Sequence, residues 1–163
     1  MKSVLLSRYL DTAGNGTGTK NAVGNYAGAV EEFYIEPGAG ETYKLTRLIV
    51  TIEDTGGGTA QEYGNIGAAL TNGIEVIVEN EDGTTIMDLT DGVPVKSNGD
   101  WARLCYDVNW LDKGSGNDYI TVRWTFAKSG SDITLEEGQR LTVQLNDSLV
   151  GLITHYFLVQ GTY

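Results

Sequence analysis

The chain has 163 residues, enough for one domain that buries about two thirds of the surface of its unfolded chain. Eleven Lys and Arg residues against 22 Asp and Glu residues give a formal net charge of -11, which disfavours binding to nucleic-acid phosphates over most of the surface. One cysteine and one histidine exclude an intramolecular disulfide, a CxxC redox motif and a Cys/His zinc cluster.

The N-terminal sequence MKSVLLSRYL contains a lysine and a short apolar run. Ser7 and Arg8 interrupt this run before it reaches the length of a signal-peptide core. No stretch approaches the roughly 18 consecutive apolar residues of a membrane-spanning helix. We therefore expect a soluble protein made in the cytoplasm of its host, with no membrane and no nucleic acid among its partners. Residues 1–29 leave room for an N-terminal strand followed by a flexible loop.

Short segments of alternating apolar and polar residues follow one another along the chain, which is typical of half-buried antiparallel strands. The alternation predicts about eight or nine strands. The side chains expected to share the core face are, in chain order, Leu48, Val50 and Ile52; Ile74, Val76 and Val78; Ile120, Val122, Trp124 and Phe126; and Leu141, Val143 and Leu145.

Asn80-Glu81-Asp82-Gly83 places Asp-Gly in a short connection and predicts a hairpin that joins residues 74–79 to residues 84–89. Residues 100–110 fit both a strand and a helix, so we expect a helical turn, capped near Asn98 or Asp100, that continues into a strand. No other segment has a helical period over three turns, which argues against a parallel βαβ fold.

Residues 11–29 and 54–65 are rich in Gly, Asn and Thr and are expected to form long surface loops. Together with the strand pattern they predict an all-β fold: one antiparallel β-sandwich domain over residues 1–163, with long Gly-rich loops. Twenty-two glycines in the chain agree with a turn-rich architecture.

His155 lies in residues 152–160, where both faces of the predicted strand are apolar, and we interpret it as a core or interface residue. A general base would need a nucleophile or carboxylate partner, and the sequence has no nucleophile elbow or other triad motif. Asp and Glu are abundant enough to form accidental pairs, so their number alone indicates no glycosidase site. We expect no enzymatic activity and assign no catalytic residues.

Two clusters carry oxygen ligands of the kind that Ca²⁺ accepts, residues 79–82 and residues 112–118. Neither has EF-hand spacing, and turn chemistry alone explains their Gly, Asn and Asp, so we assign no metal ligand. Gly14-Asn15-Gly16-Thr17-Gly18 lacks the Lys-Ser/Thr and the following helix of a phosphate loop, and we assign no cofactor. Cys105 is interpreted as a small buried apolar residue.

Nine of the fifteen aromatic residues are tyrosines, which suit both strands and contact surfaces for proteins or sugars. Those near predicted loops or termini are Tyr9, Tyr26, Tyr63 and Tyr163. Contact and structural roles both stay open for them.

Six segments together resemble a known class of proteins. They are SRYLDTAGNGTGTKNAVGNY, LTRLIVTIED, YGNIGAALTNGIEVIVENEDGT, DLTDGVPVKSNGDW, YITVRWTFAKSG and LNDSLVGLITHYFLVQG. The chain resembles the small β-sandwich virion proteins of tailed bacteriophages, of the capsid decoration or cement kind. The resemblance implies a jelly-roll-like fold, self-association as a homotrimer, and attachment to the major capsid protein on the outer surface of the virion. It carries over no site residues.

A second function remains open, a carbohydrate- or receptor-binding β-sandwich module of a phage tail or head fibre. Sugars stack on exposed aromatic faces beside polar groups. Alternation buries Trp124, so this alternative depends on Trp101 and Trp110.

Overall fold

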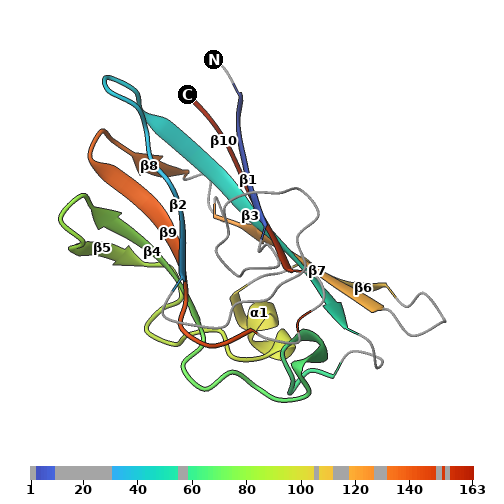
Figure 1. The fold of residues 1–163 in the computed structure, drawn as a ribbon. Helices are drawn as coiled ribbons and strands as arrows, with labels where there is room; N and C mark the ends of the chain where they lie inside the picture. Colours follow the sequence, from blue (N-terminus) through green and yellow to red (C-terminus); the bar gives the residue numbers. More distant parts are fainter. Residues whose placement is uncertain are drawn as a thin grey trace.

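Two antiparallel β-sheets face each other in the computed structural model, with a short helix below them (Figure 1). The structure describes residues 3–9, 31–54, 59–104, 107–111, 118–126, 132–149, 152 and 155–163. The predicted all-β antiparallel sandwich is confirmed. Among the described residues, no helix has the length and apolar character needed to cross a membrane.

The larger sheet has six strands. Five follow the order β1-β10-β3-β7-β6, and the sixth, β8, pairs with residues 43–45 of β3, ahead of the part of β3 that pairs with β7. The smaller sheet has the order β2-β9-β4-β5. The strands of the larger sheet are β1 (Ser3–Tyr9), β3 (Tyr43–Asp54), β6 (Asp107–Leu111), β7 (Asp118–Thr125), β8 (Ile133–Leu135) and β10 (His155–Thr162). Those of the smaller sheet are β2 (Glu31–Ile35), β4 (Ile74–Asn80), β5 (Thr85–Asp88) and β9 (Gln139–Leu145).

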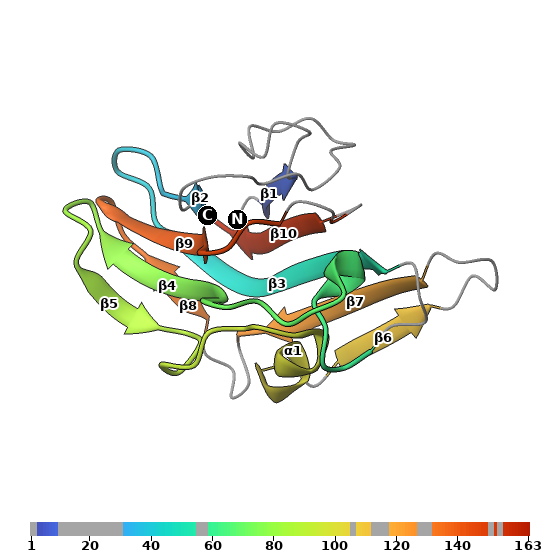
Figure 2. The same ribbon diagram turned by 60° about the horizontal axis from the view of Figure 1, so that its bottom comes forward.

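The N-terminal strand expected within residues 1–29 is present as β1, and the predicted loop at residues 11–29 lies outside the described residues. β1 pairs with β10 over its whole length, from Ser3 opposite Thr162 to Tyr9 opposite Tyr156. The two ends of the described chain therefore lie side by side (Figure 1). In Figure 2, β1 and β2 lie toward the top of the sandwich, and β5 and β6 toward the bottom.

The core lies between the sheets and contains the side chains that the alternation predicted. On β3, β7, β4 and β9 the predicted core positions are buried, with Phe126, just past β7, only partly so. These strands form because β-branched and aromatic residues at every second position present one continuous apolar face to the opposite sheet.

The predicted hairpin connects β4 to β5, and its turn is fixed by local hydrogen bonds. The Asn80 amide donates to the Thr84 carbonyl at 2.9 Å, and the Gly83 amide donates to the Asn80 carbonyl at 2.9 Å. Gly83 has φ 82°, a left-handed conformation that a residue without Cβ adopts at little cost. The connection predicted from Asp-Gly is thus confirmed.

The ambiguous segment is a helix that continues into a strand, as predicted: α1 spans Asn98–Leu104 and β6 follows. The cap is Ser97, one residue before Asn98, the nearer of the two predicted positions. Ser97 Oγ accepts a hydrogen bond from the Asp100 amide, and the Asp100 carboxylate accepts one from the Ser97 amide. This reciprocal pair is the capping box of the Ser-x-x-Asp sequence.

The prediction of a surface loop over residues 54–65 is wrong for its second half. A short 3-10 helix, η1 (Gly64–Ile66), packs onto the sandwich, and Tyr63 just before it is fully buried. The reason is a hydrogen bond from the Gly64 amide to the Asn98 side-chain carbonyl at 2.9 Å, which ties this segment to α1. Residues 55–58 lie outside the described part of the chain.

Candidate functional site

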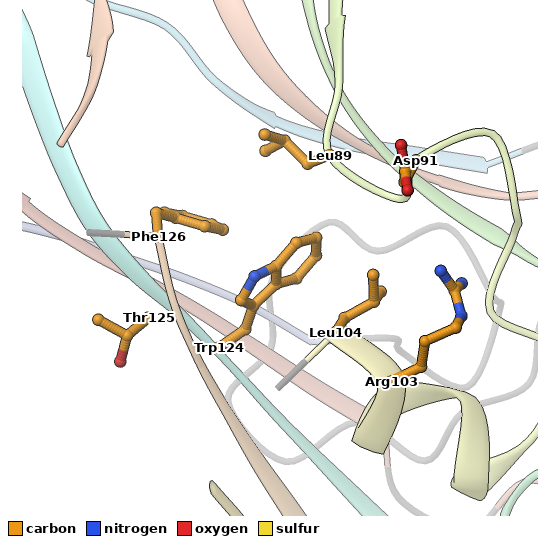
Figure 3. Close-up of a pocket in the computed structure, with 7 residues that line it drawn as sticks. All are labelled: Leu89, Asp91, Arg103, Leu104, Trp124, Thr125 and Phe126. Atoms are coloured by element: carbon orange, nitrogen blue, oxygen red, sulfur yellow. The ribbon is translucent and has the colours of Figure 1, made fainter. Parts of the chain in front are cut away.

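A groove opens on the side of the sandwich where three elements end close together (Figure 3). We call it the Trp124 groove. It has a volume of about 410 Å³ and is lined by Leu89, Asp91, Arg103, Leu104, Trp124, Thr125 and Phe126. The first two come from the turn after β5, the next two from the end of α1, and the last three from the end of β7 and the residue after it.

The walls of the groove combine four apolar residues with three exposed polar ones, Asp91, Arg103 and Thr125. Trp124 and Phe126 project from the same face of β7 and meet edge to face, with ring centroids 5.3 Å apart. Leu89 closes the other wall, where its amide donates to the Val76 carbonyl at 2.8 Å and holds the turn against β4. Leu104 is buried at the base of this arrangement. The groove therefore offers a ligand or partner a partly apolar hollow, in which Leu89 and Phe126 are the more accessible apolar side chains.

The polar rim of the groove is fixed by Arg103, which ties α1 to the turn after β5. Its guanidinium donates to the Val93 carbonyl at 2.6 Å and to the Thr90 carbonyl at 3.4 Å. Asp91 stands in this turn with φ 59°, a conformation in which Asp and Asn are enriched. The rim therefore depends both on the Arg103 side chain and on the backbone conformation of the turn that it binds.

Exposed apolar side chains lie near the groove. Every residue of β5 is exposed, including Ile86 at 47% and Met87 at 48%. Val93, whose carbonyl binds Arg103, is 52% exposed. Large apolar side chains gathered at an exposed edge are typical of an interaction surface.

Ionised carboxylates lie beside these apolar side chains. The backbone hydrogen bond from Thr84 to Asp82 lowers the pKa of the Asp82 carboxyl. Partial burial raises the pKa of Asp88, but hydrogen bonds from Thr90 and Gly92 outweigh this and leave that pKa lowered. Both groups are therefore negative at neutral pH.

His155, the one histidine of the chain, lies in the core, as the sequence indicated. Its Nε2 is hydrogen-bonded to the Tyr63 hydroxyl at 2.7 Å, and both side chains are fully buried. Desolvation lowers the pKa of His155 to about 3 and raises the pKa of Tyr63. The imidazole is therefore neutral and shielded from solvent. It serves as a packed core residue that is hydrogen-bonded to Tyr63.

Sequence reasoning missed Tyr63 as the partner of His155. The two residues are 92 positions apart, and Tyr63 stands in a segment that resembles a surface loop. No local signal links them. The tyrosines Tyr9 and Tyr26 lie outside the residues whose side chains are described, whereas Tyr163 is 42% exposed and packs against Tyr43 with ring centroids 5.7 Å apart.

The first of the two oxygen-rich clusters does not converge on a common point. Glu79 is buried, and its Oε1 accepts hydrogen bonds from Arg140 Nε at 2.8 Å and from Thr142 Oγ1 at 2.6 Å. Asp82 instead accepts the Thr84 amide in the hairpin turn. Within the described ranges no three His, Cys, Asp or Glu side chains are grouped as metal ligands.

Several residues weighed from the sequence fall outside the described part of the chain. They are Gly14 to Gly18, Cys105 and residues 112–117. Of the three tryptophans, Trp101 is fully buried and Trp124 is 6% exposed, so neither presents a free ring face to a sugar. The side chain of Trp110 is not among those described.

Comparison of the chain with protein-family models, with curated proteins and with solved structures found no match.

Proposed function

We propose that this chain is a non-enzymatic structural protein of a phage virion, which binds the outer surface of an assembled capsid and stabilises it. The proposal rests on the six-segment resemblance and on one structural observation, the exposed apolar edge at β5 beside the Trp124 groove. A jelly-roll-like strand arrangement and a homotrimer belong to the same proposal.

Physical reasoning supports this function. A protein that binds the assembled shell and not the free subunits stabilises the shell by mass action. When several copies are linked and bind together, the overall avidity exceeds the affinity of each single contact. The formal charge of -11 favours free copies that stay dissolved before they bind.

The position of His155 supports a role without catalysis. Histidine is the commonest general base near neutral pH, but here the one imidazole is buried against Tyr63. Two of the carboxylates are held in hydrogen bonds, Glu79 by Arg140 and Thr142, and Asp88 by the turn after β5.

The test is co-sedimentation of the purified protein with undecorated capsid shells, compared with unassembled major capsid subunits. We expect saturable binding to the shells alone and a higher temperature of shell disruption. Analytical ultracentrifugation of the free protein tests the homotrimer. Protein that stays in the supernatant at saturating concentration contradicts the decoration role, and binding on a glycan array would favour the carbohydrate-binding module instead.

A further inference from the structure

The inner face of β5 is left uncovered by the opposite sheet. Met87 lies directly opposite Val78 in the ladder, and residues opposite each other share a face of the sheet. Val78 is 4% exposed and belongs to the core, whereas Met87 on the same face is 48% exposed. Leu89, two residues further along, lines the Trp124 groove. An apolar path therefore runs from the inner face of β5 into the groove.

The backbone of β5 is oriented toward a further extended chain. β5 is the last strand of its sheet among the described strands. The Leu89 amide bonds to the Val76 carbonyl, so the amide and carbonyl of Asp88, one residue earlier, point away from β4. A β-bulge and a length of four residues limit pairing along this edge. Docking here must therefore rely mainly on side chains that enter the groove.

The negative charge of the segment around β5 favours a positively charged partner. Residues 81–93 contain four carboxylates, Glu81, Asp82, Asp88 and Asp91, and no Lys or Arg. Two neighbouring cations donate to backbone carbonyls, Arg103 to Thr90 and Val93, and Lys96 to Thr71 at 2.6 Å. Both keep their positive charge and Arg103 lines the groove, so the four carboxylates exceed the neighbouring cations by two. A cationic partner finds favourable charges here, whereas a second copy of this chain would bring the same acidic segment against it.

We propose that the Trp124 groove and the inner face of β5 form a docking site for an extended segment of a partner protein in which apolar residues alternate with Lys or Arg. Side chains of an extended segment alternate between its two faces, so its apolar residues enter the groove while its cations reach the carboxylates of residues 81–93. The volume of about 410 Å³ lies within the range of roughly 300–1,000 Å³ that binding pockets have. This inference goes beyond the capsid role, because it assigns a surface and a partner chemistry whatever protein supplies the segment.

The test uses the full chain and a defined probe, a peptide of alternating Lys and Val with one central Phe. A second peptide with Glu in place of Lys is the matched control. Methionine methyl groups and backbone amides are followed by NMR during titration at low salt. Met1 is the only other methionine, so at most two methyl signals have to be assigned. We expect the Met87 methyl and the amides of residues 86–91 to shift saturably with the Lys peptide alone, and the affinity to fall as salt is added.

Exposed positions provide variants that keep the fold. Glu81→Gln combined with Asp91→Asn should weaken binding of the Lys peptide by about threefold to tenfold at low salt. Val93→Ser should also weaken it. The control combines Glu36→Gln with Glu136→Gln, which removes two exposed carboxylates outside the groove lining and should leave the affinity unchanged.

The proposal would be overturned by the absence of shifts at β5, by equal binding of both peptides, by equal loss of affinity in the control variant, or by signals from β5 that move with protein concentration alone. The last result would identify a second copy as the occupant. Contacts between the groove and another segment of the same chain, detected before any peptide is added, would also contradict a partner site.

Discussion

The buried pair of Tyr63 and His155 predicts that the protein loses stability in mild acid. In the native state the imidazole resists protonation until its pKa of about 3, whereas an unfolded chain binds the proton near the ordinary value of 6.5. Between these values the unfolded state binds more protons, so stability is complete above pH 6.5 and falls as the pH is lowered toward 3. The slope is about 1.4 kcal/mol per pH unit, which gives a loss of about 2 kcal/mol at pH 5.

The single histidine makes this window informative, because carboxyl groups with ordinary pKa values titrate mostly below it. The assay is urea unfolding at intervals from pH 7 to pH 5. The control is the double variant Tyr63→Phe/His155→Phe, which replaces both polar partners by apolar rings of similar shape and should unfold with little pH dependence in this range. Equal slopes for the wild-type chain and the double variant would refute the reasoning, as would an imidazole that titrates near pH 6.5 in the folded protein.

Three further predictions concern the fold. Gly161→Ala should destabilise the protein by about 1–3 kcal/mol in thermal unfolding, because the added Cβ meets the backbone of β3, whereas Gly38→Ala meets only a flexible glutamate side chain and should be nearly neutral. Asp147→Ala should increase hydrogen exchange at residues 71–73, whose three amides donate to this carboxylate; unchanged exchange would show that the loop holds without it. Arg140→Met should cost about 3–5 kcal/mol in urea unfolding because it leaves the buried Glu79 without its cation, and a cost near zero would mean that Thr142 alone satisfies the carboxylate.

The strands could be predicted wherever one face is buried and the other is polar. β7 is the clearest case, with Ile120 and Val122 fully buried while Arg123 and Thr125 are exposed. The helix α1 also had a local signal, because Ser97 and Asp100 form the capping box that the Ser-x-x-Asp spacing encodes.

Features that depend on distant partners could not be predicted. Glu79 was considered only as one of a cluster of oxygen ligands, yet it is buried and accepts a hydrogen bond from Arg140, 61 residues away in sequence. Tyr63 looked like a loop residue until the fold placed it against His155. The Trp124 groove was missed for the same reason, since the ends of β5, α1 and β7 meet only in the folded molecule.

The adjacency of β1 and β10 makes the chain a good subject for circular permutation. A short linker could join the paired ends, and new termini could be opened in the β4–β5 turn at residues 81–84, where every residue is exposed. Such a permutant would keep both sheets while moving the free ends from the β1 side of the sandwich to the β5 side. A reporter fused there would lie at the start of β5, at the opposite end of that strand from Leu89 and Asp91 of the Trp124 groove.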